Sequence, residues 1–177
     1  MATSVLSLLA VLAGVVVLVP AVALALLVTG IRTQNPRILG AVRRFNRSYG
    51  NRAPLRVAGK EGSATGLLYH RGRTSGREYA TPIGPGAEPG GFAVMLPYGP
   101  GTDWLRNLRA AGSAVLRFDG RTYRVDRPEV VPVANTVLAE REATMIRIFG
   151  ARTALRLRAT EISSEETTQG PARPTTS

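Results

Sequence analysis

The 177-residue sequence contains no cysteine and only one histidine, His70. Without cysteine there is no disulfide, thiolate nucleophile or cysteine-ligated metal, and a single histidine excludes a zinc site made of several imidazoles. The sequence also lacks a G-x-G-x-x-G fingerprint, a Walker loop and any convincing Ser-His-Asp spacing. No catalytic residue or metal ligand therefore stands out, and an enzyme built on this chain needs a cofactor to supply the reactive atom.

Lysine is almost absent, since 22 of the 23 basic residues are arginine, against 12 acidic residues and a net charge of +11. Such a bias often reflects coding rich in G and C, so part of it carries no functional meaning. The remaining positive charge favours anionic partners, which are phosphorylated ligands, acidic lipid headgroups or nucleic acid. With 44% apolar and 20% charged residues, the composition predicts a globular domain of ordinary size.

The N-terminal stretch 5–29 has no charged residue. At about 1.5 Å per residue it reaches roughly 37 Å, enough to cross a hydrocarbon core of about 30 Å. The start "MATS" lacks the basic region of a signal peptide. Two alternatives stay open: a cleaved signal peptide, because "AVA" at 21–23 resembles a cleavage site, and a buried core helix. We predict a retained transmembrane anchor at 1–30. Arginines follow it and none precedes it, which predicts a single-pass protein of the cell membrane with its folded domain on the cytoplasmic side.

The next segment, 31–54, is basic and amphipathic. Its apolar residues have helical spacing within 36–49: Ile38, Leu39, Val42 and Phe45. Its arginines fall largely on the other side: Arg37, Arg43, Arg44 and Arg47. Two interpretations remain open, a helix lying on anionic membrane lipid and a linker helix packed on the domain.

The folded part is expected over 55–162, before a Thr-, Ser-, Pro- and Glu-rich tail, 163–177, which is predicted to be disordered. The predicted elements are strands at 65–70 and 78–83, a loop at 84–91, a strand at 92–98, a short helix within 99–112, a hairpin over 113–128 and a helix over 131–150. Asp119–Gly120 is the favoured two-residue turn of that hairpin. Together these elements predict a mainly β fold with flanking helices, a small and mostly antiparallel barrel.

Two stretches carry candidate chemistry. In "HRGRTSGREYATP", 70–82, backbone N–H groups of a glycine-containing turn lie among three arginines and two hydroxyls, which suits a phosphodiester or a polyanionic tail. The alternative is a solvated hairpin tip. In "MLPYGPGTDWLRN", 95–107, flat apolar side chains and an amide suit a planar heterocycle, and Trp104 shares a helix face with Asn107. The alternative is a tryptophan that anchors the helix to the core.

Four pieces, "GRTSGREYATPI", "FAVMLPYG", "DWLRNLRAAG" and "GRTYRV", resemble in order and spacing the deazaflavin-dependent nitroreductase family. The resemblance covers roughly 60–130. Members of that family are actinobacterial split β-barrel (FMN-binding-like) proteins that use coenzyme F420 to reduce quinones or nitroaromatics. The resemblance implies an oxidoreductase that transfers a hydride from the reduced deazaflavin to a quinone or nitroaromatic-type acceptor. An N-terminal membrane segment is not a general feature of the family.

Carried over by position, the resemblance implies three groups of cofactor-binding residues. The phosphate and acidic tail would be held by Arg73, Thr74 and Ser75, and the path toward the ring lined by Tyr79, Thr81 and Pro82. The ring would be bordered by Met95, Leu96, Pro97 and Tyr98 and closed in by Trp104 and Asn107. The family often has lysine at the positions of Thr74 and Tyr98. Because this chain lacks those lysines, the contact with the tail would shift to Arg71 and Arg77, and FMN stays the alternative cofactor.

Two other function classes remain open. The domain could bind F420, FMN or haem without turnover, or the chain could be a basic membrane-surface or nucleic-acid-binding protein. No row of aromatic residues for base stacking lies among the arginines, so nucleic acid is not expected as a partner. The expected partners are a small hydride acceptor and anionic membrane lipid, and a homodimer is left open.

Overall fold

The computed structural model describes residues 2–45 and 54–162, so the predicted disordered tail and the end of the predicted basic helix lie outside the described residues. Its helices are α1 (Ala2–Arg32), α2 (Pro36–Phe45), α3 (Asp103–Ala111), α4 (Leu138–Arg141) and α5 (Ala143–Phe149), with short 3-10 turns η2 (Pro54–Arg56) and η3 (Val133–Asn135). Its strands are β1 (Gly66–Arg71), β2 (Glu78–Ile83), β3 (Pro85–Glu88), β4 (Gly91–Met95), β5 (Ser113–Phe118), β6 (Arg121–Pro132) and β7 (Thr153–Glu161).

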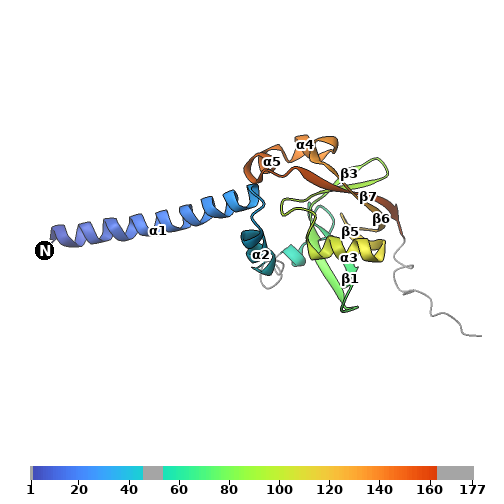
Figure 1. Ribbon diagram of the computed structural model, residues 1–177, viewed down its shortest axis with the longest axis horizontal. Helices are drawn as coiled ribbons and strands as arrows, with labels where there is room; N and C mark the ends of the chain where they lie inside the picture. Colours follow the sequence, from blue (N-terminus) through green and yellow to red (C-terminus); the bar gives the residue numbers. More distant parts are fainter. Residues whose placement is uncertain (1, 46–53, 163–177) are drawn as a thin grey trace, which may run out of the picture.

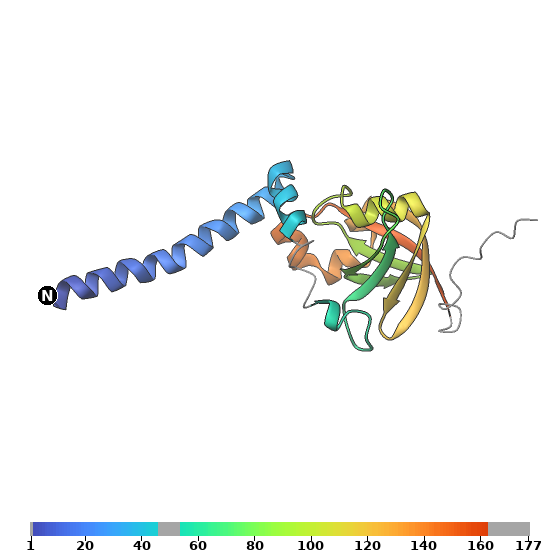
Figure 2. The same cartoon turned by 90° about the horizontal axis from the view of Figure 1, so that it is seen from below.

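All strands of the described residues form one sheet in the order β2-β1-β5-β6-β7-β4-β3, and each neighbouring pair is antiparallel. The sheet curls into a half-barrel, with α3 packed against β1 and β5 (Figure 1). Figures 1 and 2, two views at 90° to each other, both show α1 extending away from this body as a long helix. The predicted mainly β fold with flanking helices is confirmed.

The hairpin of β5 and β6 forms where the sequence predicts it. Asp119 and Gly120 have φ angles of 50° and 74°, the positive values that a type I′ turn requires at both central residues. The turn sets the register, which begins at Phe118↔Arg121. Because this turn is decided by two adjacent residues, the sequence alone predicts it.

The helix predicted over 131–150 is wrong in its first part. β6 continues to Pro132 because its second half pairs with β7, from Glu129↔Arg156 to Pro132↔Thr153. Helical structure resumes in the short helices α4 and α5. The sequence patterns also do not predict β3, which lies inside the expected loop, or β7, which joins β6 to β4.

The sheet is covered by apolar side chains on both faces at β4. Phe92 and Val94 belong to the main core, and Ala93 belongs to a second cluster that includes Leu138 of α4. The main core comprises Leu68, Ile83, Phe92, Val94, Leu96, Leu105, Leu108, Ala114, Leu116, Val125, Leu155 and Leu157. The continuous apolar run around β4 therefore reflects burial on two sides.

The apolar side of α2 packs partly against α1. A Cβ on Gly30 would lie 2.2 Å from Cδ1 of Ile38, and Leu39 is buried. The contact is with α1, so the linker helix packed on the domain stays a prediction. No single helix of the described residues has both the length and the apolar composition to cross a membrane, whereas Val16–Arg32 and Pro36–Val42, bent by 113°, have both together. The transmembrane anchor and the contact with lipid therefore stay predictions.

The corner between α1 and α2 is tied to the folded body by two side chains. The Arg32 guanidinium donates hydrogen bonds to the carbonyl oxygens of Arg147 and Ile148 at the end of α5. The Gln34 amide donates to the carbonyl oxygen of Pro97, at 3.3 Å. Pro97 follows β4, so the corner contacts the loop that precedes α3.

Candidate functional site

A pocket of about 190 Å³ lies between the ends of β2 and β4 and the start of α3. It is lined by Pro82, Ile83, Gly84, Val94, Met95, Leu96, Pro97, Tyr98, Gly99, Thr102 and Trp104. Six of the residues that the resemblance assigns to the cofactor are among them, from three separate stretches of chain: Pro82, Met95, Leu96, Pro97, Tyr98 and Trp104. The wall combines flat rings with aliphatic groups, as a site for a planar heterocycle requires.

Thr102, in the wall of this pocket, has a buried hydroxyl that forms no hydrogen bond within the described residues. It is the N-cap residue of α3, yet its side chain does not cap the helix. An N-cap threonine usually accepts a hydrogen bond from the first turn, and a buried hydroxyl left without a partner costs free energy. This hydroxyl therefore has unused hydrogen-bonding capacity beside the pocket.

The basic turn between β1 and β2 is a compact loop. Gly72 N–H donates to the Arg77 carbonyl at 2.7 Å, and Gly76 N–H donates to the Gly72 carbonyl at 2.8 Å. The Ser75 hydroxyl lies 3.3 Å from the Tyr79 hydroxyl. A Cβ on Gly72 would lie 2.5 Å from Oγ of Ser75, so only glycine fits beneath these side chains.

The turn leaves fewer backbone donors for an anion than the sequence pattern suggests. The N–H groups of Gly72, Arg73, Gly76 and Arg77 all donate within the protein. Those of Thr74 and Ser75 have no acceptor among the described residues. These two successive N–H groups, with the Thr74 hydroxyl and the Arg73 guanidinium, are the available donors for an anion.

A chain of hydrogen bonds, the His70 relay, connects this turn to α3 and β2 and is buried at its centre, between Asn107 and His70. Oδ1 of Asn107 accepts from the Arg73 backbone N–H at 3.2 Å and from its guanidinium at 3.0 Å. Nδ2 of Asn107 lies 3.2 Å from Nδ1 of His70, whose Nε2 lies 2.9 Å from Oγ1 of Thr81. Asn107 therefore faces the turn and is not part of the pocket wall, although Trp104, one turn earlier on α3, is.

His70 is 8% exposed, and its burial lowers its pKa below the ordinary value of 6.5. Between the two values the unfolded chain binds more protons than the folded chain, so stability rises with pH. The contribution of His70 is fully present above about pH 6.5 and is lost as the pH falls through its folded pKa. We expect the free energy of unfolding, measured with denaturant from pH 7.5 to 4.5, to fall more steeply for the wild type than for His70→Asn.

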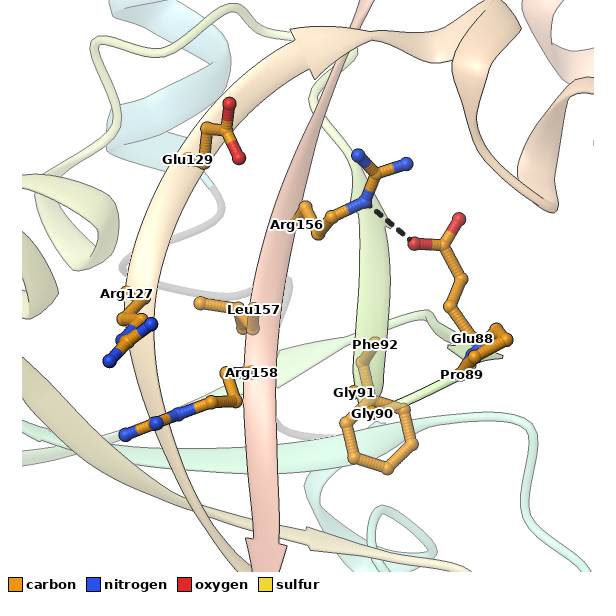
Figure 3. Close-up of a pocket in the computed structure, with 10 residues that line it drawn as sticks. All are labelled: Glu88, Pro89, Gly90, Gly91, Phe92, Arg127, Glu129, Arg156, Leu157 and Arg158. Atoms are coloured by element: carbon orange, nitrogen blue, oxygen red, sulfur yellow. Dashed lines mark hydrogen bonds and ion pairs between the residues drawn. The ribbon is translucent and has the colours of Figure 1, made fainter.

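A second pocket, of about 350 Å³, lies on another part of the sheet and is surrounded by side chains of β3, β4, β6 and β7 (Figure 3). Its charged groups are largely paired, since Arg156 donates to Glu88 at 2.9 Å. Arg158 donates to Asp126 at 2.6 and 2.8 Å, and this hydrogen bond lowers the pKa of Asp126. None of the sequence-predicted site residues lines this pocket, so the pocket at Trp104 is the better candidate.

The motifs in the sequence do not identify two polar residues of the candidate site. Thr102 stands beside Asp103 at the start of a helix, where a capping role is the ordinary expectation. His70 occupies an alternating strand position, and its partner Asn107 lies 37 residues away. Only the pairing of His70 with buried polar groups in the fold distinguishes it from a surface residue.

A scan of protein-family models finds no match for the chain, and a search of the curated proteins finds none either. Among solved structures, protein Atu2129 of Agrobacterium tumefaciens, of unknown function, is 16% identical with a TM-score of 0.39, over 59% of this chain and 54% of its own. The chain thus spans about half the length of that protein. An F420 reductase is 12% identical (TM-score 0.38, 55% and 86% covered), and hypothetical protein Rv2991 of Mycobacterium tuberculosis is 15% identical (TM-score 0.38, 66% and 87% covered).

Proposed function

We propose that the protein is an oxidoreductase that binds reduced deazaflavin coenzyme F420, with its ring in the pocket at Trp104 and its anionic tail on the turn 72–77. The acceptor of the hydride is a quinone or a nitroaromatic-type compound. One observation carries the proposal: six residues from three stretches, each matched to the family motifs, line a single cavity. The cavity is also lined by Thr102, whose buried hydroxyl has no partner among the described residues.

The size of the pocket suits part of a coenzyme. About 190 Å³ is below the roughly 300–1,000 Å³ of whole-ligand pockets, so the cavity fits a flat ring system and leaves the rest of the ligand outside. The rings of Tyr98, Pro97 and Trp104 offer apolar surfaces to such a ring. The Thr102 hydroxyl supplies one polar contact that fixes its orientation.

The basic turn suits the tail of the same ligand. α3 connects the two parts, because Trp104 lies in the pocket wall and Asn107 holds Arg73. The guanidinium of Arg73 and the free N–H groups of Thr74 and Ser75 form charge-assisted hydrogen bonds with a phosphodiester. Arg71 is a weaker candidate for the tail, because it already pairs with Glu78 at 3.7 Å.

When bound, a reduced deazaflavin supplies a hydride from its ring carbon to the acceptor. The chain contributes orientation and exclusion of water, since apolar side chains form the pocket wall. The N-terminal end of α3 begins at this wall, and its positive dipole end stabilises negative charge on a carbonyl or nitro oxygen of the acceptor. The protein needs no charged catalytic group for these roles.

The proposal extends to the cell membrane. The apolar N-terminal segment, which has the length and composition of a span only as the bent pair of α1 and α2, would anchor the chain in a single pass, with the folded domain on the cytoplasmic side and the arginines near α2 facing anionic lipid. Large apolar side chains on α1 are exposed, among them Val17, Leu18 and Leu26. An anchored domain suits an acceptor that is dissolved in the bilayer, such as a quinone.

The test is a titration of the full chain in detergent micelles with coenzyme F420, FMN and haem, followed by fluorescence or absorbance. We expect binding of F420 at micromolar concentration, and oxidation of the reduced coenzyme when a quinone analogue is added. Failure to bind F420 would overturn the proposal. Tight binding without oxidation by any quinone or nitroaromatic acceptor would make the protein a binding module, and preference for FMN would change the cofactor.

Replacing Thr102 is expected to change stability and ligand binding in opposite directions. Thr102→Val removes a buried hydroxyl without a partner and retains its shape, so we expect the free energy of unfolding to rise by up to about 1 kcal/mol. The affinity for F420 should fall about five- to tenfold, because one hydrogen bond to the ligand is lost. Denaturant unfolding and the fluorescence titration measure the two effects. The control Thr102→Ser, which keeps the hydroxyl, should bind as the wild type does, and equal binding by Thr102→Val would contradict the assignment.

A further inference from the structure

The hydrogen bonds of the His70 relay fix which of its atoms carry protons. Arg73 presents two donors to Asn107, its backbone N–H and its guanidinium, so the atom that meets them must be the amide oxygen. The amide NH₂ of Asn107 then faces His70, and Nδ1 of His70 must accept. Nε2 therefore carries the hydrogen and donates to the Thr81 hydroxyl. All contacts of the relay are satisfied by one state, a neutral imidazole with its proton on Nε2.

We propose that His70 and Asn107 are positioning residues for the anion-binding turn. Neutral His70 orients the Asn107 amide so that its oxygen holds Arg73, and protonation of His70 releases Arg73 and weakens binding of the ligand tail. The proposal rests on the proposed function in one respect, because it takes the anion held by Arg73 to be the tail of the coenzyme.

The release follows from donor and acceptor counting. A proton on Nδ1 places an N–H of His70 against the NH₂ of Asn107, 3.2 Å away, and two donors repel. If the amide rotates to offer its oxygen to His70, its NH₂ turns toward the two donors of Arg73. Both outcomes remove the amide oxygen that holds Arg73 and leave it only the solvent-open ion pair with Asp103. Asn107 and His70 are 6% and 8% exposed, so water cannot easily replace either.

The surroundings of His70 contain little that favours a charged imidazole. On β2 the Tyr79 ring stacks on the imidazole with 5.7 Å between centroids. The one carboxylate on α3 is that of Asp103, which lies 3.5 Å from the Arg73 guanidinium. The other charged groups on β1, β2, β5, α3 and the turn are exposed: Arg71, Arg77, Glu78, Arg106, Arg109 and Arg117. Burial, which lowers the pKa of His70, thus keeps the relay assembled near neutral pH.

A first experiment needs no ligand. His70 is the only histidine, so its ring ¹⁵N signals are unambiguous in NMR spectra of the full chain in detergent micelles. We expect the Nε2–H tautomer at about pH 7.5. On acidification the guanidinium signal of Arg73 should shift with the same midpoint as the His70 ring. An Nδ1–H tautomer, or an Arg73 signal that ignores the titration of His70, overturns the proposal.

A second experiment measures the consequence for binding. The Kd of the full chain for coenzyme F420 should rise about tenfold as the pH falls through the midpoint that NMR gives for His70. His70→Asn offers an amide at the position of Nδ1 and does not titrate, so its affinity should stay near the high-pH wild-type value at every pH. His70→Leu offers no acceptor and should bind about tenfold more weakly at every pH.

The outcomes separate this proposal from the proposed function. If F420 binds and the pH dependence persists unchanged in His70→Asn, the dependence belongs to the ligand or to another group, and the relay proposal is wrong. If F420 does not bind at any pH, the proposed function is wrong, and the NMR titration of His70 and Arg73 still decides whether the relay positions the turn. If His70→Leu does not fold, His70→Asn and the wild-type spectra remain sufficient.

Discussion

Arg73→Ala is expected to weaken the binding of coenzyme F420 about thirtyfold, because a charge-assisted hydrogen bond contributes about 2 kcal/mol. The free energy of unfolding should fall by less than about 1 kcal/mol, since the side chain is 35% exposed and its ion pair with Asp103 is open to solvent. The backbone N–H of residue 73 still donates to Asn107 in this variant, so the turn keeps its shape. Fluorescence titration and denaturant unfolding measure the two quantities.

Arg71→Ala is the matched control for this prediction. It removes the same charge from the same end of β1, but Arg71 pairs with Glu78 at 3.7 Å and both side chains are largely exposed. We expect less than a threefold change in affinity for F420. Equal losses in the two variants would show that only net positive charge attracts the ligand, and the specific role of Arg73 would be wrong.

Gly91→Ala is expected to lower the free energy of unfolding by at least about 4 kcal/mol, which would leave much of the chain unfolded. Gly91 begins β4 opposite Arg158 of β7. A Cβ at this position would lie 1.8 Å from the carbonyl oxygen of Leu157 and 2.9 Å from its carbonyl carbon. Both are backbone atoms in the sheet, so no side-chain rotation can relieve the overlap, and the two strands would have to separate.

Gly90→Ala is the control, in the adjacent turn residue. Gly90 has a φ of 77° and open space at the position of a Cβ. Alanine there should lower the free energy of unfolding only by the cost of the left-handed backbone, about 1–2 kcal/mol. Thermal and denaturant unfolding of the two full-length variants give the comparison. A Gly91→Ala protein as stable as Gly90→Ala would contradict the close approach of β4 and β7.

The parts of the fold that were predictable from sequence depend on neighbouring residues. The β5–β6 hairpin follows from Asp119 and Gly120, and β2 is predicted at 78–83, directly after a glycine-containing turn. β7 has an alternating pattern too, with Leu155 and Leu157 buried and Arg158 exposed. Its partners β4 and β6 are distant in the sequence, however, so no local signal gives its place in the sheet. The same distance conceals the length of β6, whose second half needs β7.

The candidate site divides in the same way. The residues at 95–98 and Trp104 are recognisable as motif positions, and the fold places them with Pro82 in one pocket. The role of His70 depends on hydrogen bonds to residues on two other elements. Thr102 stands out because its buried hydroxyl forms no hydrogen bond among the described residues. Hydrogen-bond satisfaction is a property of the packed chain, so residues of this kind cannot be predicted from spacing.

The corner between α1 and α2 makes the N-terminal helix a lever on the pocket. α1 has 31 residues and is about 46 Å long at the standard rise, so a small tilt moves its far end by several times more than its base. Gln34, at that base, holds the Pro97 carbonyl, and its Oε1 would lie 2.8 Å from a Cβ on Gly99. Pro97 and Gly99 both line the pocket. A change in the tilt of α1 therefore acts on the wall of the pocket through Gln34, and we expect a cut just before Asn35 to relax that wall, because it removes the Gln34 contact.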